Sequence, residues 1–161
     1  MNYAPDFELK GIDENGKENL YSLDSLLKKG KLLVLYFYPK DSTPGCTMEA
    51  CDFRDNMARL SSEALVVGIS ADSIESHKKF QEKYRLPFPL LSDPEKNVIK
   101  QYKSFGNKTL YGKIVQGIIR STFIIDIDKK IVKHWHKVSP KGHAQEVLDF
   151  LKEINPNLSI E

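Results

Sequence analysis

The chain of 161 residues has few cysteines, no concentration of one charge and no long apolar run, and each shortage excludes a class of protein. Two cysteines are too few for a secreted disulfide scaffold, and a core of this size does not need one. The 24 Lys and Arg residues against 22 Asp and Glu give a formal charge of +2, with both signs interspersed. We therefore expect no nucleic-acid partner and no membrane partner.

Targeting and cofactor motifs are also missing. The first ten residues, MNYAPDFELK, have neither the basic nor the apolar segment of a signal peptide, and no apolar run approaches the roughly 20 residues of a membrane span. The G-x-G-x-x-G and G-K-[ST] phosphate loops do not occur. We expect a cytoplasmic protein with a single domain over residues 1–161 and no nucleotide, flavin or metal cofactor.

What the sequence does contain is an alternation of strand and helix patterns. The apolar runs at 31–38 and 64–70 are typical of buried strands, and the polar segment 45–60 between them suits a helix, which gives a βαβ unit. Further helices are expected at 74–85, 93–102 and 143–154, and a short strand at 86–93. Residues 117–128 and 131–137 predict an antiparallel hairpin.

The beginning of the chain predicts a second hairpin. Asn15-Gly16 lies between alternating polar and apolar residues, which is the strongest short hairpin signal. Ser22 can then cap a short helix that ends at Gly30. The complete pattern predicts a thioredoxin-like mixed β-sheet flanked by helices, with an N-terminal β-hairpin extension.

Both cysteines lie in the stretch PKDSTPGCTMEACDF, at the start of the predicted helix. Thr43 can serve as its N-cap, and Pro44 fits the first helical position, where a missing N–H costs nothing. Cys46 then lies in the first turn, where free N–H groups and the helix dipole favour its thiolate. We expect a reactive thiol at Cys46 rather than the small buried hydrophobe that a lone helical cysteine usually is.

The spacing of the two cysteines leaves two interpretations open. Five helical residues place the Cα atoms of Cys46 and Cys51 about 8 to 9 Å apart, whereas a disulfide needs less than about 7 Å. If these cysteines bond, the first turns of the helix must unwind. If they do not, Cys51 is a packed core thiol.

Arg120 is the remaining residue with an unexpected environment. It lies in GIIRSTFIID, an otherwise apolar segment, where a cation is costly unless it has a partner. An arginine beside a thiolate would stabilise that thiolate. The alternative is an arginine at a strand edge that faces solvent.

The segment PKDSTPGC resembles the P-x-x-x-T-x-x-C motif of the peroxiredoxins, with Pro39, Thr43 and Cys46 in register. The segment CTMEAC looks like the subfamily called PrxQ or bacterioferritin comigratory protein, and the similarity extends from APDFEL to RSTFIID. This resemblance implies thiol-dependent reduction of hydrogen peroxide and organic hydroperoxides. Cys46 would attack the peroxide and become a sulfenic acid, and Cys51 would resolve it as an intramolecular disulfide. Thioredoxin or a similar dithiol protein would then reduce the disulfide.

The resemblance also implies roles for four neighbours of Cys46. The Thr43 hydroxyl would donate to the thiolate or the peroxide while its oxygen accepts from a backbone N–H, and Pro39 would shield the site from water. Arg120 would stabilise the thiolate. Glu49 matches a position that orients the active-site arginine, although an exposed helix carboxylate is the alternative.

Two other activities compete with this hypothesis. A thiol-disulfide oxidoreductase on the same fold would carry C-x-x-C, whereas this chain has C-x-x-x-x-C. A non-catalytic redox sensor would use the thiol pair as a switch without rapid peroxide turnover. Because both thiols lie in one chain, we expect a monomer.

The four histidines give weak signals. His134 and His136 lie on one face of the predicted strand 131–137, which indicates a solvated face rather than a metal site, with Trp135 on the packed face. His77 and His143 occur in polar helical segments, and we expect no special role for either.

Overall fold

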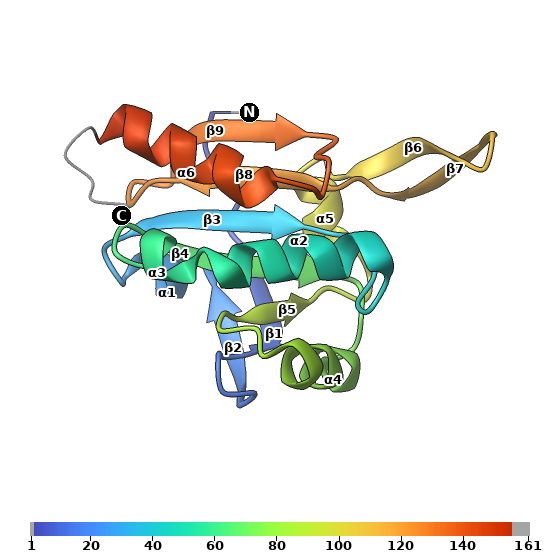
Figure 1. The fold of residues 1–161 in the computed structure, drawn as a ribbon, viewed down its shortest axis with the longest axis horizontal. Coiled ribbons are helices and arrows are strands. Elements are labelled where there is room, and N and C mark those ends of the chain that lie inside the picture. The colour runs from blue at the N-terminus through green and yellow to red at the C-terminus, as the bar shows by residue number, and fades with distance from the viewer. Residues whose placement is uncertain (1, 156–161) are drawn as a thin grey trace.

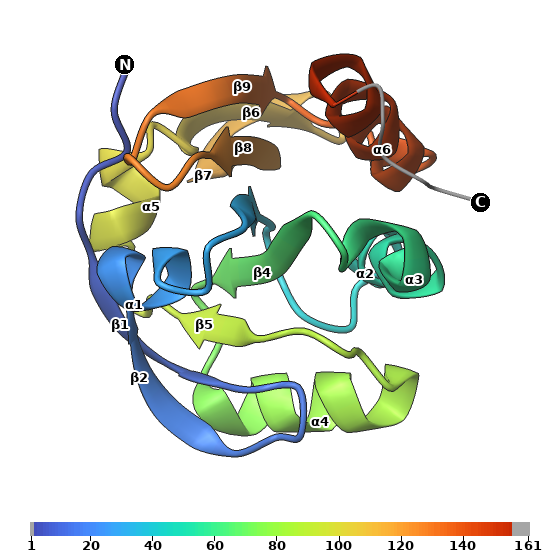
Figure 2. The same cartoon turned by 90° about the vertical axis from the view of Figure 1, so that its left-hand side faces the viewer.

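The computed structural model describes residues 2–155 as a seven-stranded mixed sheet with helices on both faces (Figures 1 and 2). The strand order is β2-β1-β5-β4-β3-β8-β9. These strands are β1 (Glu8–Ile12), β2 (Glu18–Ser22), β3 (Leu32–Phe37), β4 (Ala64–Ser70), β5 (Leu90–Ser92), β8 (Ser121–Ile125) and β9 (Ile131–His136). The helices are α1 (Leu23–Leu27), α2 (Pro44–Asp55), α3 (Met57–Leu60), α4 (Ile74–Tyr84), α5 (Asn97–Gln101) and α6 (His143–Ile154). A second sheet contains only β6 (Phe105–Leu110) and β7 (Lys113–Ile118).

The centre of the large sheet is parallel and its flanks are antiparallel. Strand β3 pairs in parallel with β4 and antiparallel with β8, and β4 pairs in parallel with β5. Five of the six residues of β3 are buried, which explains why this segment is apolar without alternation. The prediction of a thioredoxin-like mixed sheet flanked by helices is therefore confirmed.

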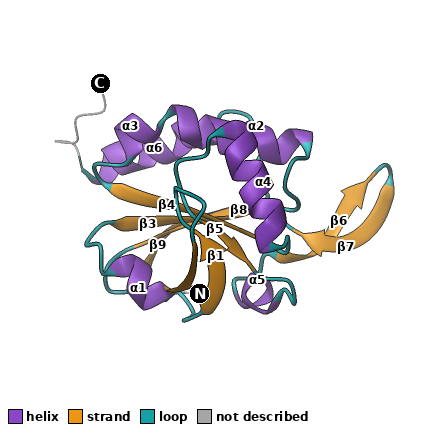
Figure 3. Cartoon of the chain, turned by 90° about the horizontal axis from the view of Figure 1, so that it is seen from below, coloured by secondary structure: helices purple, strands orange, loops and turns teal. Residues whose placement is uncertain are grey.

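The helices form two layers (Figure 3). Helices α2, α3, α4 and α6 pack on the face that carries Val34 and Tyr36, whereas α1 and α5 cover the face that carries Leu33 and Leu35. Cys46 belongs to the first of these layers. No helix within residues 2–155 combines the length and apolar character needed to cross a membrane.

The predicted N-terminal hairpin is present and is part of the large sheet. Strands β1 and β2 pair antiparallel, and the turn between them contains Gly16 with φ of +81°, a left-handed conformation that glycine adopts at little cost. β1 also pairs with β5, so the hairpin extends the sheet at its edge. At the end of β2, Ser22 and Ser25 form a reciprocal capping box that begins α1.

The prediction of one strand over residues 117–128 is wrong. Strand β7 ends at Ile118 and β8 begins at Ser121, because the chain here passes from one sheet to the other. In this crossing the Ile119 amide donates to the Ser104 carbonyl at 2.7 Å, and the Arg120 carbonyl accepts from the Val138 amide at 2.8 Å. Arg120 therefore lies between strands and not inside one.

The hairpin of β6 and β7 was not predicted. It extends beyond the body of the molecule (Figures 1 and 3). Its two-residue turn contains Tyr111 and Gly112, with φ of +51° and +77°, which is the left-handed pair that favours a tight hairpin. The usual sequence signal, Asn or Asp before the glycine, is replaced by tyrosine, and the pattern was therefore missed.

Candidate active site

The loop from β3 to α2 brings the predicted motif to the start of a helix. Pro44 is the first residue of α2, and Thr43 has the extended backbone of an N-cap. The Thr43 hydroxyl makes no capping bond; it donates to the Lys40 carbonyl at 2.7 Å, so the expectation that its oxygen accepts from a backbone N–H is wrong. The helix begins instead with the main-chain bond from the Thr47 amide to the Thr43 carbonyl, at 2.8 Å.

Cys46 lies in the first turn of α2 and is buried, with 2% of its surface exposed. Arg120 Nη2 donates to the Sγ atom at 3.3 Å. Gly45 permits this approach, because a Cβ atom at that position would lie 3.2 Å from the same nitrogen. The sulfur therefore lies beside a guanidinium in the first turn of a helix.

Glu49 holds the other terminal nitrogen of the guanidinium. Its Oε1 accepts from Arg120 Nη1 at 2.7 Å, and its side chain is fully buried. Burial raises the pKa of Glu49 to about 7, although the charge of Arg120 acts in the other direction. The second carboxyl oxygen, Oε2, is buried without a hydrogen-bond partner among the described residues, which adds to the cost of the ionised form.

A cavity opens next to this pair. Its volume is about 300 Å³, and both Pro39 and Arg120 line it. The rest of the wall combines the apolar Ile118, Ile119 and Val138 with Lys108, Thr109 and Lys137. The cavity therefore presents apolar and cationic side chains beside the guanidinium, and Cys46 is not among its lining residues.

Cys51 lies on the same helix and does not contact Cys46. Both cysteines are free thiols, Cys46 buried and Cys51 partly exposed. Burial raises the pKa of Cys51, and nearby Arg54 lowers it by a smaller amount. Because α2 is continuous from Pro44 to Asp55, a bond between the two sulfurs requires its first turns to unwind.

Known proteins are similar to this chain over most of its length. The sequence model of the AhpC/TSA family matches residues 2–134, and peroxiredoxin Bcp of Bacillus subtilis is 47% identical over 154 residues, which cover 94% of each chain. This chain belongs to the AhpC/TSA family. A putative peroxiredoxin bcp of Coxiella burnetii is 51% identical over 146 residues, covering 90% of this chain and 93% of that protein.

Solved structures agree with the sequence relatives. A cysteine-to-serine mutant of PrxQ from Xylella fastidiosa superposes with a TM-score of 0.83 at 36% identity, covering 96% of this chain and 97% of that one. The bacterioferritin comigratory protein of Xanthomonas campestris gives a TM-score of 0.79 at 38% identity, with 91% of each chain covered. The chain is thus a peroxiredoxin of the Bcp/PrxQ group and a thiol-dependent peroxidase.

Two histidines for which the sequence indicated no special role lie inside the fold of this peroxiredoxin. His77 and His143 are fully buried, although the helices that carry them are polar in sequence. His143 Nε2 lies 2.8 Å from the Thr122 hydroxyl oxygen, and burial lowers the pKa of this histidine. His77 contacts Asp41, which lies inside the motif loop five residues before Cys46. The polar residues around both histidines concealed their burial, which depends on tertiary packing.

Both strand histidines of this peroxiredoxin are exposed, as the sequence predicted. The ring of His134 also stacks on Phe123, with 4.0 Å between centroids. Trp135, on the opposite face, packs edge-on against His143 and Phe150, as the alternation predicted. Partial desolvation lowers the pKa of His134, and the neighbouring His136 lowers it further.

Proposed function

We propose that this peroxiredoxin reduces hydrogen peroxide and organic hydroperoxides with Cys46 as the attacking thiol. The Cys46 thiolate attacks one peroxide oxygen, the O–O bond breaks, and the leaving oxygen takes up a proton to depart as water or an alcohol. Cys46 becomes a sulfenic acid. The observation that carries this assignment is the 3.3 Å contact between Arg120 Nη2 and Cys46 Sγ.

The surrounding residues have roles that follow from their positions. Arg120 stabilises the thiolate and the charge that develops on the leaving oxygen, because a guanidinium remains charged and offers several donors. Glu49 orients this guanidinium through Nη1, the terminal nitrogen that does not contact the sulfur. Pro39, in the cavity wall, limits access of water, and Thr43 orients the peroxide once its hydroxyl turns from the Lys40 carbonyl.

Cys51 is the resolving thiol in this proposal. Its thiolate attacks the Cys46 sulfenic acid, a disulfide forms, and the sulfenic oxygen leaves as water. The first turns of α2 unwind for this step, because the two positions are too far apart in a continuous helix. A dithiol protein such as thioredoxin then reduces the disulfide through a mixed disulfide.

A monomer in the cytoplasm fits this cycle. Both thiols are supplied by one chain, so no second copy is needed for resolution. Thioredoxin-type reductants keep thiols reduced in the cytosol, where such a disulfide can be recycled. Size-exclusion chromatography with light scattering is the check, and a stable dimer at micromolar concentration would contradict the monomer.

The cycle itself is tested by counting thiols and measuring intact mass under denaturing conditions, before and after one equivalent of hydrogen peroxide. The expected result is the loss of both thiols, a mass decrease of two hydrogen atoms and no crosslinked dimer. Two surviving thiols would overturn the proposal. A crosslinked dimer would keep Cys46 as the reactive thiol but remove Cys51 as its partner within the chain.

A further inference from the structure

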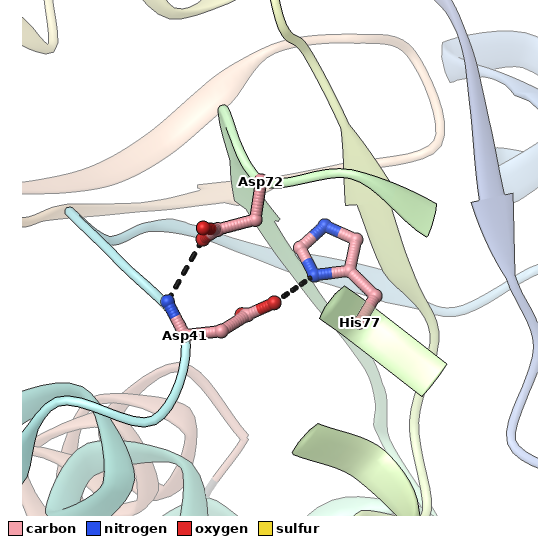
Figure 4. A group of neighbouring side chains, drawn as sticks. All are labelled: Asp41, Asp72 and His77. Carbon is pink, nitrogen blue, oxygen red and sulfur yellow. Dashed lines mark hydrogen bonds and ion pairs between the residues drawn. The ribbon is translucent and has the colours of Figure 1, made fainter. Parts of the chain in front are cut away.

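A buried hydrogen-bond network joins α4 to the loop that leads to Cys46. Its centre is Asp41, whose side chain is 1% exposed. The carboxylate accepts hydrogen bonds from the Tyr38 hydroxyl at 2.5 Å and the Ser76 hydroxyl at 2.8 Å. His77 Nδ1 lies 2.7 Å from the same Oδ2 atom that Ser76 contacts (Figure 4).

The main chain of the loop is held at the same point. The Asp41 amide donates to Asp72 Oδ2 at 2.8 Å (Figure 4). The Ser70 hydroxyl donates to the same oxygen at 2.6 Å. Ser70 ends β4 and Asp72 follows it, whereas His77 belongs to α4. The loop is therefore fixed to a central strand and to a helix through a single residue, Asp41.

The backbone next to Asp41 needs such support. Ser42 has φ of +63°, a left-handed conformation that is unfavourable for a residue with a Cβ atom. Backbone of this kind persists only where the surrounding contacts hold it. Ser42 lies between Asp41 and Thr43, so any release of Asp41 lets this strained residue relax and shifts the residues on both sides of it.

His77 is itself fixed at both ring nitrogens. Nε2 lies 2.9 Å from the Leu91 carbonyl, which only accepts hydrogen bonds, so Nε2 carries a proton. The contact between Nδ1 and the Asp41 oxygen also needs one proton, which lies either on the ring or on the carboxyl group. The ring thus bridges β5 and the loop, with no freedom to turn while both bonds are made.

We propose that His77 is a positioning residue of the peroxidase reaction, acting through Asp41 to hold the loop of residues 39–43 in the geometry that places Pro39 and Thr43 around Cys46. This inference rests on the proposed function of Cys46. It assigns no contact between His77 and the peroxide. The bond between His77 Nδ1 and Asp41 affects the rate at which Cys46 reacts with peroxide, and not only the stability of the fold.

A metal site is the competing interpretation of the same cluster. The ligand atoms of Asp41, Asp72 and His77 lie within 4.8 Å of one another. However, both ring nitrogens and both Asp41 carboxyl oxygens already have protein partners at hydrogen-bond distance. An ion would have to displace these bonds, so the arrangement favours a hydrogen-bonded support over a ligand set.

Two substitutions at His77 separate its two bonds. In His77→Asn the amide nitrogen takes the place of Nδ1 and keeps the bond to Asp41, whereas in His77→Gln it takes the place of Nε2 and keeps the bond to Leu91. Each variant loses one buried hydrogen bond, so a purely structural role lowers the melting temperature of both. Leu26→Ala, in the core on the opposite face of the sheet, is the control for general destabilisation.

The rate constant for the first reaction of Cys46 with hydrogen peroxide distinguishes a positioning role of His77 from a purely structural one. We expect His77→Gln to react about tenfold more slowly or worse, because small misplacements of reacting groups are costly, and His77→Asn to stay within about threefold of the unsubstituted protein. Leu26→Ala should melt earlier with an unchanged rate. Equal rates for the two His77 variants would overturn the inference.

Two further outcomes are informative. If the unsubstituted protein does not react with peroxide at Cys46, the proposed function fails and not the role of His77 alone. If the His77 variants do not fold, Ser76→Ala removes one hydroxyl donor to Asp41 and leaves the ring in place. We expect about twofold to threefold slower reaction for Ser76→Ala with little loss of stability, and an unchanged rate would overturn the inference.

Discussion

Arg120 donates to Cys46 from a position 74 residues further along the chain, with 3.3 Å between Nη2 and Sγ. It can do so because it lies in the crossing between β7 and β8, where its side chain is not committed to the face of a strand. Glu49 on α2 completes the arrangement by accepting from Nη1. The positive charge beside the Cys46 sulfur therefore comes from a residue that is distant in sequence and is brought close by the fold.

Replacing Arg120 should slow the first reaction with peroxide. We expect Arg120→Ala to lower its rate constant about 100-fold, because loss of one donor to a developing charge costs that much in related chemistry. Arg120→Lys should lose about tenfold, since lysine keeps the charge but cannot reach Cys46 and Glu49 together. Stopped-flow fluorescence under single-turnover conditions measures both.

Arg59→Ala is the matched control for these variants, because Arg59 lies exposed on α3. Its rate should match that of the unsubstituted protein. If the rate constant of Arg120→Ala lies within twofold of that of the unsubstituted protein, Arg120 has no role in the reaction with peroxide.

Serine substitutions separate the roles of the two cysteines. Cys46→Ser should abolish peroxide consumption, because a hydroxyl is not ionised at neutral pH. Cys51→Ser should react once at the normal rate, accumulate a sulfenic acid and fail to turn over with thioredoxin. Trapping of the sulfenic acid with dimedone and mass spectrometry measures the first turnover. Equal loss of that turnover in both variants would contradict the assignment.

Local sequence patterns sufficed for the centre of the fold. The apolar runs at 31–38 and 64–70 correspond to β3 and β4, because a strand buried on both faces has few polar residues. The start of α2 was equally predictable, since Thr43 and Pro44 have preferences that act within a few residues. Cys46 was placed correctly in the first helical turn for the same reason.

What could not be predicted depends on contacts between distant segments. The break at Arg120 arises from a bond between Ile119 and Ser104, and no local signal marks it. His77 is buried because Asp41 and Leu91 surround it, although its own helix is polar. The burial of Glu49 also depends on a distant segment, because the ion pair with Arg120 offsets part of the cost of burying its carboxyl group.

The raised pKa of Glu49 should make stability depend on pH. Its folded-state pKa is about 7 against an ordinary value of 4.5, so the folded protein binds this proton more tightly than the unfolded chain does. The free energy of unfolding therefore falls as pH rises through that window, by about 3 kcal/mol, since each pKa unit is worth about 1.4 kcal/mol. Glu49→Gln should abolish this loss.

Urea unfolding at a series of pH values tests this prediction. The difference in unfolding free energy between Glu49→Gln and the unsubstituted protein should rise by up to about 3 kcal/mol from about pH 4.5 to about pH 7. Glu82→Gln, on the exposed face of α4, is the control. A difference that stays constant with pH would show that Glu49 does not titrate in this window.

Formation of the disulfide should unwind only the beginning of α2. The later part of the helix is anchored, because Asp52 Oδ2 accepts from the Ala144 amide at 3.1 Å and Phe53 is fully buried. The amides of residues 47–51 lie between this anchor and Cys46, whose sulfur must leave its contact with Arg120 to reach Cys51. We expect these amides to lose at least about tenfold of their hydrogen-exchange protection in the oxidised protein, while α4 keeps its protection.

Peroxide-treated Cys51→Ser is the control for this exchange experiment, because it reaches the sulfenic acid without a disulfide and should keep α2 protected. The comparison separates the effect of the bond from that of oxidation. If the oxidised protein keeps full protection over residues 47–51, the helix has not opened, and its geometry then rules out a bond between Cys46 and Cys51 within one chain. Recycling would in that case need a thiol from another molecule.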